Sequence, residues 1–309
     1  MSARIVTLTL NPAVDLACEA AAVVPIRKIR MTGEIYDAGG GGINVARVVH
    51  ELGGEALAVL MAGGATGNFL EELLDEAGVE RRIIPVRGRT RISVTVHDHS
   101  SQLEYRFVPE GPLISEAEWR SVLSALEEIE AGWLVASGSL PRGVPKDFYA
   151  RLARIAARRG QRLVLDTSGA ALRAALGQGL TLIKPSLGEL EELLGRPVRE
   201  PKDQEEQALA LAQSGAAQMV VVSLGAEGAV LATARKVIRL AAPAVAVRSA
   251  VGAGDGFVAG MTLGLARGLE PQAAFVWGIA TGTSAVMSYG TAHLHRADVE
   301  ALHARLCST

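Results

Sequence analysis

Length, composition and charge restrict the protein to a few classes. The chain has 309 residues, of which 49% are hydrophobic and 21% are charged, a balance typical of a globular protein with a large core. Its formal net charge is -2. Such a charge gives no overall field that would attract nucleic acid or an acidic membrane, so we expect neither as a partner.

The cysteines and the N-terminal segment indicate a cytoplasmic protein. Cys18 and Cys307 are the only two cysteines, too few and too far apart for a disulfide framework, which predicts two reduced thiols. Residues 5–10 predict a first strand rather than a secretory leader. No apolar run reaches the roughly 20 residues of a membrane helix. We therefore expect neither export nor a membrane span.

Strand-like and helix-like segments alternate along most of the chain. Strands are predicted at 5–10, 56–61, 133–136, 163–165, 182–183, 219–222 and 244–247, and helices at 43–52, 68–77, 145–159, 258–267 and from Ser115, where Glu118 completes a capping box. Apolar strands that alternate with helices predict a parallel sheet covered on both faces. Ligands of such sheets bind at the carboxyl ends of the strands.

Two stretches depart from this alternation of strands and helices. Residues 21–37 and 89–107 contain alternating strand patterns with no helix between them, which predicts antiparallel strands. These strands form either a small additional sheet, such as a lid, or an edge extension of the main sheet. Their spacing alone favours neither arrangement.

The first glycine-rich segment, residues 38–47, leads directly into a predicted helix. Its four glycines, Gly39 to Gly42, allow a ligand to approach the backbone closely, and the helix start suits an anion or a hydroxyl group. A flexible turn is the alternative interpretation. Asn44 adds a donor and an acceptor at the helix start, where it either binds a ligand or caps the helix.

The second glycine-rich segment, residues 251–257, also precedes a helix. The backbone N–H groups of Gly252, Ala253 and Gly254 are expected to point to one place, along the dipole of that helix, and to form an anion hole. Asp255 lies within this segment. It is either a helix cap or a base that accepts a hydroxyl proton while the amides hold a transferring phosphoryl group.

Neither segment matches a common nucleotide fingerprint. Phe257 and Asn44 stand where Gly-x-Gly-x-x-Gly requires its last glycine, and the chain contains no Gly-x-x-x-x-Gly-Lys-Ser/Thr. Both observations disfavour a dinucleotide oxidoreductase and a P-loop enzyme.

Together the two segments resemble the two signatures of the phosphofructokinase B group of ribokinase-like carbohydrate kinases. Four further stretches, residues 7–15, 137–141, 184–189 and 222–228, resemble other motifs of the group in the same order. Within the group the chain is most similar to the minor-type bacterial 6-phosphofructokinases. The resemblance thus covers the whole chain.

The resemblance implies a fold and an assembly. The fold is α/β, a ribokinase-like three-layer α/β/α sandwich with a small antiparallel β lid, in one kinase domain that spans residues 1–309. The lid is formed by roughly residues 16–37 and 89–108. In this group the lids of two subunits commonly clasp, which implies a homodimer through the lid.

The resemblance also implies the activity: ATP- and Mg²⁺-dependent phosphorylation of a ketohexose phosphate, most simply of fructose 6-phosphate to fructose 1,6-bisphosphate. A 1-phosphofructokinase and a tagatose-6-phosphate kinase are close alternatives. A kinase for a neutral sugar or nucleoside keeps the fold but does not need the basic residues of the lid strands. A non-catalytic sensor of nucleotide or sugar phosphate is the alternative from another class.

Site residues are carried over from the matching motifs. Asp255 is the implied catalytic base, and Gly252, Ala253 and Gly254 the implied anion hole. The implied ligands of the sugar hydroxyls are Asp15, Gly40, Asn44 and Ser139, and the candidates for its phosphate are Lys28, Arg30, Arg91 and Arg106. The implied ATP site consists of Lys184, Ser186, Ser223, Gly225 and Gly228. Glu189 is implied to place Mg²⁺, through water, although it also completes a capping box with Ser186.

The sequence departs from the group pattern at three positions. Ser186 stands where the family usually has Asn, Ala250 where Thr is usual, and Gly256 where a small polar residue follows the aspartate. Ser186 changes the expected phosphate or magnesium contacts, Ala250 removes one hydroxyl near the expected nucleotide, and both are the reason for keeping the sensor hypothesis. None of the three removes the predicted base or anion hole.

Overall fold

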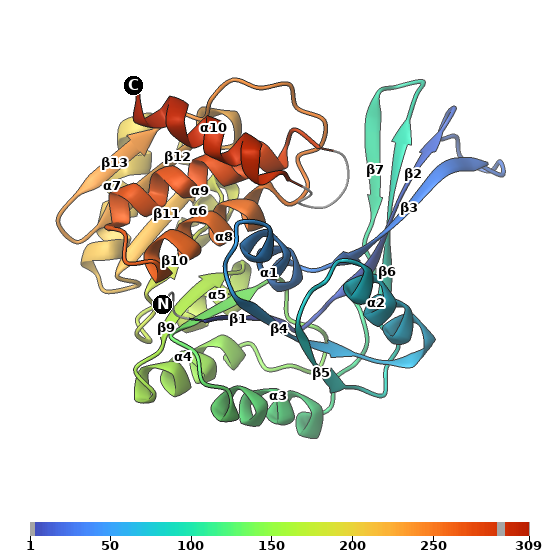
Figure 1. Ribbon diagram of the computed structural model, residues 1–309, viewed down its shortest axis with the longest axis horizontal. Helices are drawn as coiled ribbons and strands as arrows, with labels where there is room; N and C mark the ends of the chain where they lie inside the picture. The colour runs from blue at the N-terminus through green and yellow to red at the C-terminus, as the bar shows by residue number, and fades with distance from the viewer. Residues whose placement is uncertain (1–3, 289–293, 309) are drawn as a thin grey trace.

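A twisted sheet of nine strands forms the body of the protein (Figure 1). This computed structural model describes residues 4–288 and 294–308. In sheet order the strands are β13 (Val237–Leu240), β12 (Ala229–Thr233), β11 (Met219–Ser223), β10 (Leu182–Ile183), β9 (Arg162–Asp166), β8 (Trp133–Ser137), β1 (Ile5–Thr9), β4 (Ala56–Ala62) and β5 (Arg81–Pro85). All neighbours from β11 to β5 pair in parallel, and only β12 and β13 are antiparallel. The predicted parallel sheet is confirmed.

The strands are apolar throughout because both faces of the sheet are buried. In β8, Trp133 and Val135 pack into the core on one side, whereas Leu134 and Ala136 pack into the core on the other. This period-two alternation supplies hydrophobic side chains to two cores from one strand. The sheet is therefore the middle layer of three.

Helices cover each face. The first helical layer consists of α3 (Glu116–Glu128), α4 (Phe148–Arg158), α5 (Gly169–Ala175), α6 (Leu187–Leu194) and α7 (Pro201–Gln213). The second consists of α1 (Gly41–Glu51), α2 (Gly64–Glu76), α8 (Ala253–Ala266), α9 (Pro271–Ala285) and α10 (Arg296–Cys307). The predicted helices are confirmed with shifts of a few residues at their ends, and the capping box of Ser115 and Glu118 is present. Among the described residues, no helix is long and apolar enough to cross a membrane.

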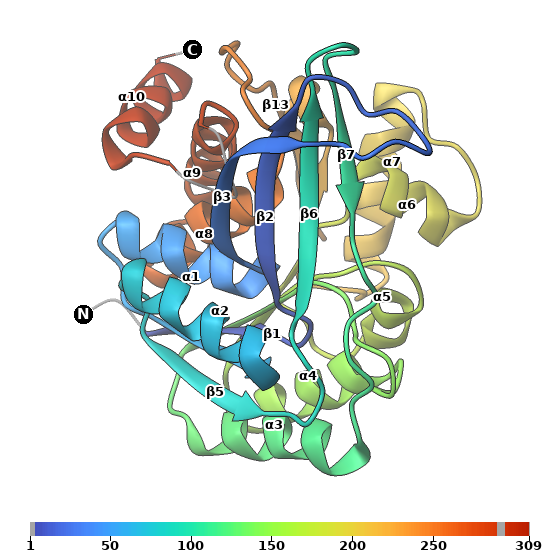
Figure 2. The same cartoon turned by 90° about the vertical axis from the view of Figure 1, so that its right-hand side faces the viewer.

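A second sheet projects from the body (Figure 1). Its strand order is β3 (Met31–Gly39), β2 (Ala13–Ala20), β6 (Arg91–Asp98) and β7 (Leu103–Phe107). We call it the small sheet. It is a separate sheet and not an edge extension of the large one. Its outer pairs are antiparallel as expected, but β2 and β6 run in parallel, because both leave the body and extend in the same direction (Figure 2).

The two faces of the small sheet differ in polarity. On one face the register places Asp15 beside Asp37 and Ser93, and Thr95 beside Arg106. On the other face it places Leu16 beside Tyr36 and Val94, and Val94 beside Phe107. Tyr36 packs edge-to-face on Phe69 of α2, but Phe107 is 56% exposed. The apolar face is thus only partly covered.

The carboxyl ends of the parallel strands meet at one edge of the large sheet, where both glycine-rich segments also lie. The strand predicted at residues 244–247 is wrong. These residues form an irregular connection between β13 and α8, without a ladder partner. Because Ala246 and Val247 line a cleft there, the connection borders the site instead of extending the sheet.

Candidate active site

A cleft of about 990 Å³ lies between the small sheet and the body. Its walls are the polar face of the small sheet, the starts of α1 and α8, and the connection that contains Ala246 to Val251. The structure brings into this cleft the predicted residues Asp15, Gly40, Asn44, Arg91, Arg106, Gly252 and Asp255. These residues come from five different elements and loops.

Asp255 lies in the first turn of α8 at the bottom of this cleft. Its Oδ2 accepts a hydrogen bond of 2.8 Å from Nδ2 of Asn44, and its Oδ1 accepts one of 3.4 Å from Oγ of Ser137. Burial raises the pKa of the Asp255 carboxyl, against the lowering effects of the Asn44 bond and the charge of Lys184. A carboxylate with a raised pKa is a better proton acceptor than a free one.

The first turn of α8 contains the residues of the predicted anion hole. Gly252 is its N-cap residue and has a φ of 81°, which favours glycine. A Cβ atom on Gly254 would lie 3.2 Å from Nζ of Lys184, so this ammonium group lies over the same turn. Helix-terminal N–H groups and a lysine charge together suit a phosphoryl group.

Lys184 follows the last residue of β10 and is held by Asp166, the last residue of β9. Its Nζ lies 3.3 Å from Oδ1 of Asp166, and both side chains are almost fully buried. Burial raises the pKa of Asp166 to about 6, and the nearby charges of Asp255 and Glu189 add to this. Asp166 keeps the pKa of Lys184 raised despite its burial. Lys184 therefore keeps its positive charge beside the first turn of α8.

The opposite wall of the cleft combines carboxylates, among them Asp15 and Asp37, with two arginines. Burial raises the pKa of Asp15, while the charges of Arg91 and Arg106 lower it. The guanidinium group of Arg91 donates to the carbonyl oxygens of Pro109 and Asn11, at 2.9 and 2.8 Å. These bonds fix the position of Arg91, whereas Arg106 is exposed.

Three predicted sugar-site residues lie outside the cleft lining. Lys28 and Arg30 are exposed in the loop between β2 and β3, at the far end of the small sheet. Ser139 follows β8, and its Oγ accepts a 3.3 Å hydrogen bond from Nδ2 of Asn11. Ser139 is thus adjacent to the cleft, and Lys28 and Arg30 are not.

The predicted nucleotide residues lie together on the far side of Lys184. Ser186 forms a parallel bridge to Ser223, which ends β11. Gly225 begins a short 3-10 helix, η1 (Gly225–Glu227), and Gly228 follows it with a φ of 95°. Glu189 accepts a 2.7 Å hydrogen bond from the N–H of Ser186, so the capping box is present.

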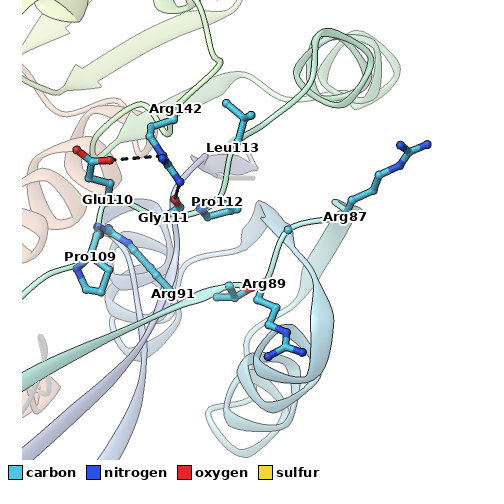
Figure 3. Close-up of a pocket in the computed structure, with 11 residues that line it drawn as sticks. Arg87, Arg89, Arg91, Pro109, Glu110, Gly111, Pro112, Leu113 and Arg142 are labelled. Carbon is cyan, nitrogen blue, oxygen red and sulfur yellow. Dashed lines mark hydrogen bonds and ion pairs between the residues drawn. The ribbon is translucent and has the colours of Figure 1, made fainter.

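A second pocket, of about 710 Å³, lies behind Arg91 and contains three more arginines (Figure 3). Arg142 pairs with Glu110 at 3.4 Å. The side chains of Arg87 and Arg89 point away from each other and from Arg142 (Figure 3). Because these charges do not converge, the pocket lacks the geometry of an anion site.

Three residues of the site were not identified from the sequence. Ser137 and Asp166 are the last residues of β8 and β9, so a search for polar residues at the ends of predicted strands would have found both. Arg47 contacts Asn44 from one helical turn further on. In the sequence, the only signal for Arg47 is its position three residues after Asn44 on a predicted helix, where side chains of the same face meet.

A carboxylate beside the N-terminus of a helix, in a cleft that also holds arginines, suits the transfer of a phosphoryl group to a hydroxyl. Known proteins agree with this class. The model of the pfkB family carbohydrate kinases matches residues 9–297. The ATP-dependent 6-phosphofructokinase isozyme 2 of Mycobacterium tuberculosis is 44% identical over 299 residues, which are 96% of this chain and 88% of that protein.

Solved structures give the same result. Phosphofructokinase-2 from Escherichia coli in complex with fructose-6-phosphate matches with a TM-score of 0.93 and 38% identity over 99% of each chain. Ribokinase of Arabidopsis thaliana, with ribose and ATP, has a TM-score of 0.78 at 21% identity, over 98% of this chain and 99% of that one. The chain belongs to the pfkB family of carbohydrate kinases, and its fold is ribokinase-like.

Gly41 tests how closely the two glycine-rich segments must approach. A Cβ atom there would lie 2.1 Å from Oγ of Ser137 and 3.0 Å from Oδ1 of Asp255. We expect Gly41→Ala to displace Asp255 and to lower kinase turnover by roughly 100-fold, measured as ADP release. The matched control is Gly188→Ala, because a Cβ on Gly188 meets nothing within 4 Å. Equal activity of the two variants would contradict this geometry.

Proposed function

We propose that this protein transfers the γ-phosphoryl group of ATP to fructose 6-phosphate and forms fructose 1,6-bisphosphate. The observation that carries the proposal is the position of Asp255, in a cleft that has the anion hole on one side and Arg91 and Arg106 on the other. A phosphorylated acceptor needs cations at its far end, whereas a neutral sugar does not. The relatives with 6-phosphofructokinase names support the same substrate.

Each residue near Asp255 has a proposed role in the reaction. Asp255 takes the proton of the sugar C1 hydroxyl as its oxygen attacks the γ-phosphorus. The bond from that phosphorus to the β–γ bridging oxygen breaks, and ADP leaves with the electron pair. The N–H groups of Gly252, Ala253 and Gly254, with Lys184, stabilise the charge on the transferring group. In-line transfer needs positioning and charge neutralisation more than covalent help.

We place ATP and its Mg²⁺ on the side of Lys184 that faces away from the sugar site. Ser186, Ser223, Gly225 and Gly228 form one small region at the ends of β10 and β11, where we place ATP. Mg²⁺ prefers oxygen ligands and keeps several waters. Glu189 faces the Asp166–Lys184 pair, as its effect on the pKa values of both residues indicates, so it would hold the magnesium of Mg-ATP through water. That ion would neutralise phosphate charge.

The sugar phosphate fits the other side of Asp255. We assign its hydroxyls to Asp15, Gly40, Asn44 and Ser139, and its phosphate to Arg91 and Arg106. Lys28 and Arg30 are exposed and do not line the cleft of their own chain. They contribute only if a second subunit brings its loop to this cleft.

We further propose that the small sheet acts as a lid and joins two subunits in a homodimer. Its apolar face leaves several large side chains exposed, including Ile92, Tyr105 and Phe107, and exposed apolar patches of this kind mark interaction surfaces. A lid would also exclude water, which competes with the sugar as acceptor. We place the reaction in the cytoplasm, which suits the two free cysteines.

The direct test is an assay of ADP release with excess Mg-ATP and four acceptors: fructose 6-phosphate, fructose 1-phosphate, tagatose 6-phosphate and unphosphorylated fructose. We expect the highest kcat/KM with fructose 6-phosphate. A preference for another phosphate keeps the mechanism and changes the substrate. Turnover of fructose alone, or none with any of the four, would refute the proposal.

Asp255→Asn separates catalysis from binding. The variant keeps the shape of the side chain but cannot accept the hydroxyl proton, so we expect turnover to fall by roughly 10²–10⁴-fold. The affinity for ATP, measured by calorimetry, should change little. Because burial raises the pKa of Asp255 and the ionised form is the base, wild-type kcat should fall as the pH falls through that raised pKa. A sensor would show no turnover to lose.

Phe107→Glu tests the proposed dimer. Phe107 is 56% exposed on β7, and a buried glutamate charge would disrupt an apolar interface. We expect the variant to sediment as a monomer at a concentration where the wild type sediments as a dimer. The control is Leu113→Glu, because Leu113 is 69% exposed and lies outside the small sheet. A wild-type monomer, or an unchanged variant, would contradict a lid-mediated dimer.

A further inference from the structure

Arg47 lies on α1, three residues after Asn44, at the point where the body meets the small sheet. Its Nη2 donates to Oδ1 of Asn44 at 2.6 Å and to the carbonyl oxygen of Ala38 at 3.2 Å. Its Nη1 lies 3.9 Å from Oδ1 of Asp37, and only 13% of either side chain is exposed. One guanidinium group thus joins α1 to β3.

The bond from Arg47 determines which end of the Asn44 amide faces Asp255. An amide side chain presents one oxygen acceptor and one NH₂ donor. Because the oxygen of Asn44 accepts from Arg47, its Nδ2 faces Oδ2 of Asp255 and donates to it at 2.8 Å. The flipped amide would place an oxygen against the carboxylate and an NH₂ against the guanidinium. Both contacts are repulsive, so the pair of bonds selects one orientation.

We propose that Arg47 is a positioning residue for phosphoryl transfer: it fixes the Asn44 amide so that Asp255 is held as an ionised, correctly aimed base. The inference rests on the proposed role of Asp255 as that base. It gives a function to a residue that lines neither the sugar side nor the nucleotide side of the cleft. In this series of hydrogen bonds, which we call the donor chain, Arg47 donates to Asn44 and Asn44 donates to Asp255.

The charges around Arg47, Asn44 and Asp255 determine how the removal of Arg47 would change the pKa of Asp255. Arg47 faces the carboxylates of Asp37, Asp15 and Asp255, which stabilise its charged form against burial. Asp255 faces the cations Lys184 and Arg47, and the carboxylate of Asp166. Further out, Glu189 faces Asp166 and Lys184, and Arg91 and Arg106 face Asp15. Without Arg47, Asp255 loses one of two nearby cations and the fixed donor, and its pKa rises.

The test compares Arg47→Met and Arg47→Lys with Arg267→Met in the full-length protein. Methionine keeps the length of the side chain without its charge or donors, and lysine keeps the charge without the forked geometry. Arg267 is the matched control, because its guanidinium donates to the carbonyl oxygens of Leu52 and Gly53 at the other end of α1. Thermal unfolding confirms that each variant folds.

For Arg47→Met we expect kcat on the alkaline plateau to fall roughly tenfold or more, with KM for ATP nearly unchanged. The acid limb of the kcat profile should move up by roughly one pH unit. Arg47→Lys should recover part of both changes. In an Asn44→Ala background, Arg47→Met should lower the activity little further, because the hydrogen bond from Asn44 to Asp255, which Arg47 orients, is already lost. Arg267→Met should change neither kcat nor the pH profile.

A second measurement does not depend on turnover. The Asp255 titration is followed by carboxyl ¹³C NMR, with the signal assigned by its loss in Asp255→Asn. Arg47→Met should raise the midpoint, and Arg267→Met should not. An unchanged midpoint, an unchanged acid limb, or full additivity with Asn44→Ala would overturn the inference. If the wild type has no kinase activity but its Asp255 midpoint moves in Arg47→Met, the proposed function fails while the positioning contact stands. If Arg47→Met does not fold, Arg47→Lys decides by the same readouts.

Discussion

The rest of the site depends on a carboxylate held beside the place where a phosphoryl group must bind. Asp255 and the incoming phosphate are both negative, and burial weakens the solvent screening between them. The surrounding structure offsets this repulsion from three directions: the N–H groups of the first turn of α8, the ammonium group of Lys184, and the donor chain from Arg47 through Asn44. Asp166 is needed in turn because Lys184 is itself buried.

Glycine makes this crowding possible. Gly40 has a φ of 132°, and Gly41 approaches the side chains of Ser137 and Asp255 so closely that no Cβ atom fits. The turn before α1 can therefore lie directly against the turn before α8, although 211 residues separate Asn44 from Asp255. This close approach brings the side chains of Asn44 and Asp255 within hydrogen-bonding distance.

The two proposed roles of the small sheet follow from the difference between its two faces. Side chains alternate along a strand, so one register supplies Asp15, Asp37 and Arg106 to the cleft and Leu16, Val94 and Phe107 to the opposite surface. A shift of the register by one residue would exchange the two sets. The polar face is continuous with the proposed sugar site, and the apolar face is continuous with the proposed interface.

The sequence by itself determined the parallel sheet, helices α1 to α4 and α8, the family and the position of Asp255 at the start of a helix, because apolar periodicity and glycine-rich turns before helices are local signals. It could not give the parallel pairing of β2 with β6, since pairing across 70 or so residues leaves no local pattern. It wrongly predicted a strand at residues 244–247, where an apolar run found no neighbouring strand with which to pair. Only the tertiary structure decided that Lys28 and Arg30 do not line the cleft, and that Arg47, Asp166 and Ser137 lie next to Asn44, Lys184 and Asp255. The physical reason is the same in each case: the position of a charged side chain relative to a distant base depends on how whole elements pack, and no local pattern encodes that distance.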